Sequence, residues 1–483
     1  GVVVKGLFGR AGCTRMVQGG YNAVLTPPDS LEAHLTDTLD GGGWINDQEM
    51  VWRLVTEAPG RVLELESRYG CLFDRNAEGH IHQKPFAGQT HDRTVHKGDL
   101  TGIEIMNRLT EQAQARPSIR AFEECRAVEL LRDDAGRAAG ALILDVRTGR
   151  FFAVNARATL LAMGGGPTMY RVIACSADKA ADGIALAYRA GLALRDMEMI
   201  QFHPTGLVIP GSLMTGALLE EGLRGAGGQL RNGLGERFMA RYDAARMERS
   251  TRDLVSRASF LEVSEGRGTP NGGIWIDVSH LGADVVERNF RGMVRRCRDF
   301  GRDLARGPVE VGPTAHFMMG GVVVDPDCRT AMEGLFAPLG RAGGAEVYAI
   351  QRELRDLMWE RAGLVRDAEG LGVAAVTLQR LTERLEVVGV PGHGSLNTAW
   401  QDWLNLDSQL TAAQLVVASA LARRESRGAH WRRDFPAPAA TAPVSIRVQR
   451  RDGAPVVWEE PVAMTRARPR TGAPRPVAVE IGD

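Results

Sequence analysis

Four short stretches of this chain combine carboxylates, guanidinium groups and imidazoles with glycine. They are MEMIQFHPTG (197–206), LLEEGLRGAGG (218–228), STRDLVSRA (250–258) and TAHFMMGGVVVD (314–325). Side chains of these types transfer protons and stabilise anions in enzyme sites. The second stretch is the most unusual of the four. It sets two adjacent carboxylates and an arginine among glycines, where a backbone turns tightly or approaches another group closely.

Each stretch also has a purely structural interpretation when it is taken alone. A single histidine is more often a hydrogen-bonded structural residue than a ligand. The Arg252-Asp253 pair could cap a helix or form a surface ion pair, and a Gly-Gly before a strand is usually a turn. None of the four therefore identifies a site without the elements that carry it.

The pattern of apolar residues predicts those elements. Helical spacing occurs over 46–70, 101–113 and 182–191, and again as three packed helices between Ile350 and about His430. The predicted core positions of these three helices are Leu354, Leu357, Met358, Leu378, Leu381, Leu385, Trp400, Trp403, Leu404, Leu410 and Leu415.

Strand patterns occupy much of the remaining chain. They cover Val2–Val4, 138–163 with a turn at Thr148-Gly149, 272–278 and 320–325. After Pro436 a Pro- and Ala-rich stretch precedes alternating residues, which predicts a tail with short strands. Because the chain opens inside a buried strand without an initiator methionine, we expect residues to be missing ahead of it.

Composition excludes several classes of protein. The chain has 483 residues, which predicts two or more domains, and its 59 basic and 59 acidic side chains give no field that favours nucleic acid. The six cysteines form no CxxC pair, so zinc ribbons and redox dithiols are not expected, and scattered cysteines are typical of a reducing cytosol. No apolar run of 18 residues is present, so we expect no direct membrane span.

In this order, the four stretches resemble the flavoprotein subunit of succinate dehydrogenase and fumarate reductase, with L-aspartate oxidase as a relative. The resemblance covers most of the chain and includes GRAGCTRMVQGG (9–20), QKPFAGQ (83–89), GERFM (235–239), EGRG (265–268), DLMWERAGLVR (356–366), DWLNL (402–406) and ESRGAHWRRDFP (425–436). It implies a Rossmann-like α/β FAD-binding domain with an inserted α+β capping domain, a three-helix domain and a C-terminal tail domain. The implied ranges are 1–205 and 316–349 for FAD binding, 206–315 for the cap, 350–435 for the helices and 436–483 for the tail.

The implied reaction is hydride transfer between flavin and a C4 dicarboxylate, which interconverts succinate and fumarate. Reducing fumarate adds a hydride to one alkene carbon and a proton to the other, so negative charge builds toward the conjugated carboxylate and must be stabilised. The resemblance assigns the proton relay to Arg252, Glu221 and Arg224. Glu221 would lie among glycines because a proton must reach a dry site, and arginines would flank it because the substrate is a dianion.

The relay has two interpretations. Arginine is essentially never deprotonated in proteins, so a donating Arg252 must be reprotonated by Glu221 almost concertedly. Alternatively, Arg252 is an electrostatic clamp and a water molecule delivers the proton.

The resemblance also assigns ligand contacts. His203 and His316 would hold the substrate carboxylates, and Glu220 belongs to the same substrate-binding group. FAD would contact Lys5, Cys13, Thr14, Gln18, Gly19, Gly20, Gly164, Gly165 and Asp182. No metal site is expected.

This chain departs from the family pattern at several flavin-contacting positions. No GxGxxG turn precedes Val2, and Cys13 replaces the histidine that attaches covalently to flavin, which predicts noncovalent FAD, a thioether being the alternative. The absence of that covalent link favours fumarate reduction or oxidase-type turnover. The Thr-Gly pair before Asp182 is Ala180-Ala181.

Two further departures concern the substrate and the flavin ribose. Glu220 replaces a threonine, and a carboxylate there repels a dicarboxylate unless it is protonated or turned away. GLFAPLGRAGG (334–344) runs directly into AEVYAIQRELRDLM, so that Gly340 takes the place of the ribose glutamate and a substrate-binding arginine segment is missing.

The missing segments leave two explanations open. Either flavin-binding segments are absent only from the sequence as it stands, and the chain is an apo or partly disordered form of an ordinary enzyme, or it is a shortened, flavin-free scaffold. The main expectation is an FAD-dependent enzyme that passes electrons to an iron–sulfur subunit, and through it to a membrane anchor. It would be cytoplasmic, at the inner face of the cytoplasmic membrane. A soluble L-aspartate oxidase-like or fumarate reductase-like enzyme is the alternative.

Overall fold

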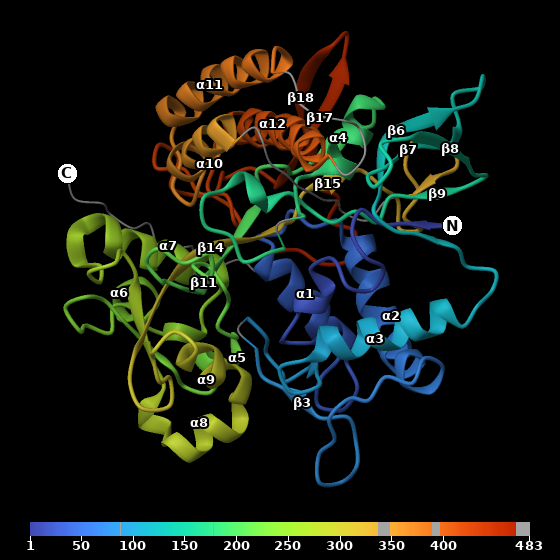
Figure 1. Ribbon diagram of the computed structural model, residues 1–483. Coiled ribbons are helices and arrows are strands. Elements are labelled where there is room, and N and C mark those ends of the chain that lie inside the picture. The colour runs from blue at the N-terminus through green and yellow to red at the C-terminus, as the bar shows by residue number, and fades with distance from the viewer. Residues whose placement is uncertain (87, 177, 337–347, 389–396, 470–483) are drawn as a thin grey trace.

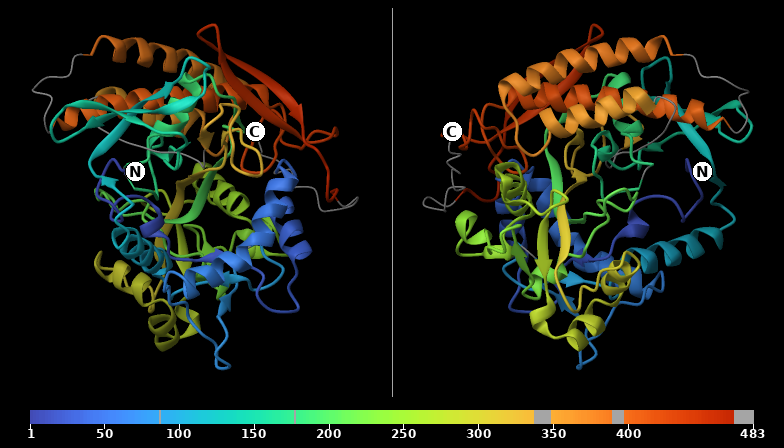
Figure 2. Two further views of the ribbon diagram at one scale, coloured as in Figure 1. Left: turned by 90° about the vertical axis from the view of Figure 1, so that its right-hand side faces the viewer. Right: turned by 60° about the vertical axis from the view of Figure 1, so that its left-hand side comes forward.

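The computed structural model describes residues 1–86, 88–176, 178–336, 348–388 and 397–469. A layer of three helices covers one end of the molecule, and the region from β11 to β14 projects at the opposite end (Figure 1). Two further views show the same arrangement (Figure 2). The predicted glutamate position at Gly340 and the junction after Phe336 lie outside the described residues.

Short parallel strands mark the flavin-binding region that the sequence predicted. Strand β1 (Val2–Val3) pairs in parallel with β5 (Ala121–Phe122), and β9 (Thr159–Leu160) pairs in parallel with β16 (Leu335–Phe336). Within the described ranges these are two separate pairs, and no described strand joins them. Helix α4 (Asp182–Arg189) follows β9 and is buried along nearly its whole length.

An N-terminal lobe is inserted between β1 and β5. It contains α1 (Leu31–Gly41), α2 (Gln48–Ser67), α3 (Thr101–Gln114) and the antiparallel sheet β2 (Tyr21–Asn22), β4 (Thr94–Val95) and β3 (Gln83–Lys84). Caps explain where its helices begin, because Ser30 accepts from the Ala33 amide at 3.0 Å and Asp47 accepts from two amides of α2. A meander of β6 (Cys125–Arg132), β7 (Ala138–Asp145) and β8 (Phe151–Asn155) follows β5.

The region between β11 and β14 has its own core. Strands β11 (Ile200–Leu207), β14 (Val309–Met318), β13 (Ile274–Asp277) and β12 (Gln229–Arg231) form an antiparallel sheet. Helices α5 (Gly222–Gly225), α6 (Met239–Tyr242), α7 (Arg252–Glu262), α8 (Ala283–Asn289) and α9 (Arg291–Arg298) surround it. Its buried apolar cluster runs from Leu207 to Val311, almost the range expected for the capping domain.

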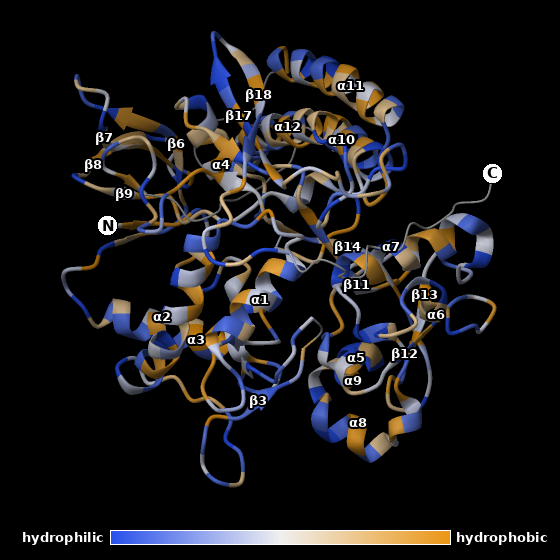
Figure 3. Ribbon diagram, turned by 180° about the vertical axis from the view of Figure 1, so that it is seen from behind, coloured by the Kyte–Doolittle hydropathy of each residue, from blue (hydrophilic) through white to orange (hydrophobic). Residues whose placement is uncertain are grey.

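The three predicted helices are present as α10 (Tyr348–Arg361), α11 (Ala368–Glu386) and α12 (Thr398–Ala422). Hydrophilic and hydrophobic segments alternate along them, as expected of amphipathic helices (Figure 3). Most predicted core positions are buried, but Leu357, Trp400, Trp403 and Leu404 are only half-buried. The tryptophans lie at the edge because their rings tolerate partial exposure: Trp400 packs on Phe151, and the Trp403 indole donates to the Leu385 carbonyl at 3.2 Å.

The C-terminal tail forms a longer and better-integrated element than its alternating sequence suggested. Strands β17 (Val444–Arg451) and β18 (Ala454–Pro461) make a hairpin of eight-residue strands. Strand β17 also pairs with β10 (Leu194–Arg195), which pairs with β15 (Gly321–Val322). This sheet ties the tail to the flavin-binding region, an arrangement that a local pattern cannot reveal.

Candidate active site

Two neighbouring strands bring the predicted histidines together. His203 lies on β11 and His316 on β14, and their ring centroids are 5.4 Å apart at an interplanar angle of 73°. The β11–β14 ladder is irregular at both positions, because Phe202 pairs with Ala315 and Gln201 with Phe317, which leaves His316 as an extra residue. A second shift follows His203. Such bulges re-aim side chains beside active sites, and here they turn both imidazoles toward one place.

The three predicted relay residues form a continuous hydrogen-bonded row. Glu221 immediately precedes α5, Arg224 follows it by three residues, and Arg252 begins α7. The Arg252 Nε donates to Glu221 Oε2 at 2.5 Å, and the Arg224 Nη2 donates to Glu221 Oε1 at 2.8 Å. Both oxygens of one carboxylate are thus held by guanidinium groups, the arrangement expected of a proton relay or an anion clamp.

Glycines allow the chain to present this row. Gly227 adopts a φ of +106°, and a Cβ at Gly228 would come within 2.6 Å of the Leu223 carbonyl oxygen. Only glycine turns the chain there without a clash. The single turn of α5 then places Glu221 and Arg224 on the same face.

Burial sets the charge state of the site. Burial alone would raise the pKa of Glu221, but Arg252 and Arg224 outweigh it and hold that pKa below its usual value. Burial, reinforced by Arg252, lowers the pKa of His316 to about 3 and that of His203 well below its ordinary value. At neutral pH the glutamate is therefore ionised and both imidazoles are neutral.

The neutral His203 has a defined tautomer. Its Nδ1 accepts from the Thr205 backbone N–H at 3.3 Å, so Nε2 carries the proton and can donate to a ligand. The Nδ1 of His316 is buried and finds no hydrogen-bond partner among the described residues. The two rings thus offer directional hydrogen bonds rather than charge.

Glu220 has a partner that the sequence did not identify. Its carboxylate accepts from the Lys84 ammonium group at 2.5 Å, across 136 residues of sequence. Glu220 is buried, and burial raises its pKa although Lys84 acts in the opposite direction. Gln201, which accepts from Arg252 Nη1 at 3.0 Å, was also missed. Lys84 and Gln201 both lie inside segments that carry the family resemblance. Their positions within those segments were the only sequence signal that could have identified them.

The residues predicted to contact FAD lie on several adjoining segments. Lys5 follows β1, and its ammonium group lies 3.3 Å from the Asp182 carboxylate at the start of α4. Cys13 Sγ accepts from the Ser176 amide at 3.3 Å, and Thr14 opens a short helical turn, Thr14–Met16. Gly164 and Gly165 follow β9, and Gly164 has a φ of +68°.

The remaining predicted contacts have packing roles of their own. Gly19 abuts Phe86, and a Cβ at Gly20 would come within 1.9 Å of the Val95 carbonyl oxygen. In the amide orientation that satisfies its hydrogen bonds, Gln18 accepts from Arg296 of α9 at 3.0 Å. The Gln18 side chain therefore connects the N-terminal region to the cap.

The Ala-Ala departure before Asp182 has a visible consequence. Ala181 adopts a φ of +66° and a ψ of +27°, a left-handed conformation that glycine reaches without strain. The Ala181 Cβ also leaves no room for a side chain at Gly166, because a Cβ at Gly166 would lie 2.7 Å from it. An alanine thus occupies a left-handed backbone position that favours glycine, the residue of the family pattern.

Some of these predicted residues have positions suited to one part of a bound flavin dinucleotide, its pyrophosphate. Lys5 and Gly164 both follow the carboxyl ends of parallel strands, the edge at which open α/β sheets bind ligands. Burial lowers the pKa of Lys5 to about 8, partly offset by Asp182. A partly buried amine that follows one strand and glycines that follow another are groups suited to an anion such as a pyrophosphate.

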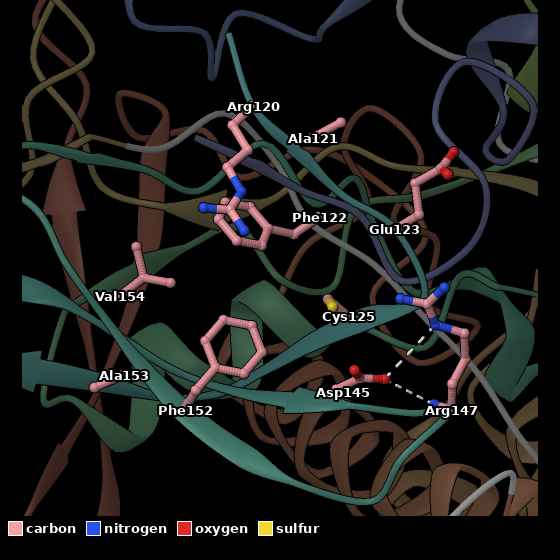
Figure 4. Close-up of a pocket in the computed structure, with 10 residues that line it drawn as sticks. All are labelled: Arg120, Ala121, Phe122, Glu123, Cys125, Asp145, Arg147, Phe152, Ala153 and Val154. Carbon is pink, nitrogen blue, oxygen red and sulfur yellow. Dashed lines mark hydrogen bonds and ion pairs between the residues drawn. The ribbon is translucent and has the colours of Figure 1, made fainter.

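One cavity lies elsewhere. It has a volume of about 680 Å³ and lies between β5, β7 and β8, with Arg120, Phe122, Phe152 and the Asp145–Arg147 pair around it (Figure 4). No relay residue and neither histidine lines it. In the described parts of the chain no three His, Cys, Asp or Glu side chains gather as metal ligands, and no helix combines the length and apolarity that a bilayer crossing requires.

Comparison with known proteins gives consistent matches over nearly the whole chain. A family model described as an FAD binding domain matches residues 2–347, and one described as fumarate reductase flavoprotein C-term matches residues 351–473. An uncharacterized FAD-dependent oxidoreductase of Methanocaldococcus jannaschii is 40% identical, over 90% of this chain and 89% of that protein. The fumarate reductase (CoM/CoB) of Methanothermobacter marburgensis contains a subunit that is 39% identical, over 90% of each chain.

A solved structure agrees with these sequence matches. The quinol fumarate reductase FrdA of E. coli, solved as a point mutant, superposes with a TM-score of 0.90 at 28% identity, covering 97% of this chain and 93% of that one. These matches confirm the predicted α/β FAD-binding fold with its C-terminal region, and they confirm FAD as the cofactor.

Proposed function

The chain belongs to the flavoprotein family of fumarate reductases and succinate dehydrogenases, which are oxidoreductases, and we propose that it interconverts succinate and fumarate. One observation carries this proposal: a hydrogen-bonded row of Arg252, Glu221 and Arg224 lies beside two neutral, facing histidines. This geometry suits a small, doubly charged acid to which a proton must be delivered.

Bound FAD supplies hydride exchange, and the side chains of this chain supply the remaining requirements. The protonated Nε2 of His203 and the imidazole of His316 donate to the substrate carboxylates without adding charge. The guanidinium of Arg252 stabilises the charge that builds on the conjugated carboxylate. Because Glu221 is ionised, a proton that leaves Arg252 has to be replaced through Glu221 by one from another donor, and Arg224 donates to the second oxygen of the same carboxylate.

The relay has a defined inner end. Arg224 is fully buried, and its Nη1 donates to the backbone carbonyl of Glu248. Burial lowers the pKa of Arg224, an effect that Glu221 opposes. Glu221 thus joins a guanidinium in the interior to the partly exposed guanidinium of Arg252.

We further propose that electrons pass to an iron–sulfur subunit, and that the enzyme is located at the inner face of the cytoplasmic membrane. The support is the family of the chain, in which the named relatives include subunits of larger reductases. A soluble flavoenzyme that uses another acceptor is the second candidate. Cys13, which replaces the flavin-linking histidine of the family pattern, supports noncovalent FAD in either case.

The test is spectroscopic and enzymatic. Purified full-length protein, reconstituted with FAD where necessary, should show a flavin absorption band that trichloroacetic acid releases, and should reduce fumarate with a reduced viologen dye. Co-purification with a cysteine-rich iron–sulfur chain would distinguish the complex-forming flavoprotein from the soluble enzyme. Protein that binds no flavin and leaves fumarate unreduced would be a scaffold that keeps only the fold.

A further inference from the structure

We propose that the Lys84–Glu220 ion pair determines substrate charge specificity, with Lys84 cancelling a carboxylate that would otherwise repel a dianion. This inference rests on the proposed function. Lys84 is a positioning residue here, because it acts through Glu220 and through the field of the site rather than on the reacting atoms.

The pair joins two lobes at the active site. Lys84 ends β3 in the N-terminal lobe, whereas Glu220 lies in the cap and directly precedes the relay residue Glu221. The Lys84 side chain is 18% exposed and the Glu220 side chain 4% exposed. The charge of Glu220 is therefore poorly screened by water, and a cation has to be brought to it.

Lys84 is held in place from its own lobe. Its ammonium group donates to the Gly98 carbonyl at 3.2 Å and lies 5.7 Å from the centroid of the Phe86 ring. The lysine is thus oriented by contacts that do not involve Glu220. Such pre-orientation reduces the entropic cost of pairing a long, flexible side chain.

Glu220 is turned toward the relay segment. Its Oε1 would lie 3.3 Å from a Cβ at Gly222, and its backbone N–H faces the Met293 sulfur at 3.4 Å. In the described part of the chain, Lys84 supplies the hydrogen bond to its carboxylate. Without that lysine a buried carboxylate would stand beside Glu221 with no counter-ion.

The charges near the site explain why this matters for a dianion. Five of these charges belong to the relay and the ion pair: Arg252, Arg224 and Lys84 are cations, and Glu220 and Glu221 are carboxylates, so these five sum to +1 while both histidines are neutral. Removing the charge of Lys84 brings this sum to zero. Removing the charge of Glu220 raises it to +2, and removing both restores +1.

This accounting separates a charge role from a mechanical one. If the pair only clips the lobes together, both single variants and the double variant should weaken the site alike. If it sets the charge, the two single variants act in opposite directions and the double variant recovers. A doubly charged ligand should also respond more strongly than a singly charged one of the same shape.

The experiment uses calorimetric titration of the FAD-loaded full chain with malonate, a non-reacting dianion, and with its monoamide, a monoanion. Lys84→Met should weaken malonate binding by about ten- to a hundredfold and monoamide binding by less. Glu220→Gln should strengthen malonate binding, and the double variant should return to within about threefold of the parent protein. Lys97→Met removes a lysine that pairs with Asp74 in the same lobe and should leave binding unchanged.

The outcomes are distinct. Three results would each overturn the inference while leaving the proposed function standing. They are a Lys84→Met variant that binds malonate as tightly as the parent, a Glu220→Gln variant that binds malonate more weakly than the parent, and a double variant that binds it as weakly as Lys84→Met. A parent protein that is loaded with FAD but binds no malonate would overturn the proposed function and this inference with it. Should Lys84→Met fail to fold, the sign of the Glu220→Gln effect still decides.

Discussion

Replacing Arg252 by lysine tests the relay most directly, because the substitution keeps the charge and removes the geometry. The guanidinium donates from Nε to Glu221 and from Nη1 to Gln201 at 3.0 Å, and its Nη2 forms an ion pair with Glu221. One lysine nitrogen at the end of a flexible stem cannot reproduce this planar set of donors. At least two charge-assisted hydrogen bonds are lost.

The expected loss of activity follows from those contacts. Two charge-assisted bonds at about 2 kcal/mol each amount to about 4 kcal/mol of transition-state stabilisation, or about a thousandfold in kcat. Folding should suffer little, because the Arg252 side chain is 26% exposed and water can replace part of what is lost. We expect a decrease in Tm of no more than a few degrees.

The assay is fumarate reduction by the FAD-loaded protein with a reduced viologen dye, alongside thermal unfolding. Arg249→Lys is the matched control, since this exposed arginine lies three residues earlier and should tolerate the change. A loss of only about tenfold would favour the clamp, in which the retained charge suffices and water delivers the proton. Unimpaired turnover would refute any role of Arg252 in the mechanism.

Two further predictions concern other parts of the molecule. His316→Ala should weaken succinate and malonate affinity by about tenfold, measured as KM and by calorimetry, and unchanged affinity would make the histidine merely structural. Glu262 is buried, which would raise its pKa, but bonds from Arg267, Arg241, Asn232 and Tyr242 outweigh burial and lower it from 4.5 to about 2. Its contribution to stability, on the order of 3 kcal/mol, should be complete above pH 4.5 and lost as the pH falls through about 2. At pH 7 the unfolding free energy of Glu262→Gln should be lower than that of the parent by about this amount, and near pH 2 most of the difference should have disappeared. A difference that does not change with pH would contradict the prediction.

The sequence predicted the helical layer well because its signals are local. Apolar residues at helical spacing defined α10, α11 and α12, and buried leucines such as Leu354, Leu378 and Leu410 occupy the expected faces. It failed for Trp400 and Trp403, whose hydrophobicity does not reveal that they lie at the edge of the layer. The pairing of β17 with β10 was also out of reach, because it joins segments some 250 residues apart.

The candidate site was predictable in its residue types but not in its electrostatics. The types and order of His203, Glu221 and Arg252 were readable from the chain, and the structure hydrogen-bonds Arg252 to Glu221 and sets the His203 ring edge-on to that of His316. The sequence flagged Glu220 as a departure without naming its counter-ion. Whether the histidines are charged could not be inferred either, since this depends on burial.

What the sequence alone determined is thus the set of chemical groups, the local elements that carry them and the family to which the chain belongs. The tertiary structure alone decided that Lys84 of one lobe meets Glu220 of another, that bulges turn His203 and His316 toward each other, and that burial leaves both imidazoles neutral. The physical reason is that helices and turns are specified by neighbouring residues. Electrostatic energies and pKa values depend instead on distance and solvent access, which exist only once remote segments have packed.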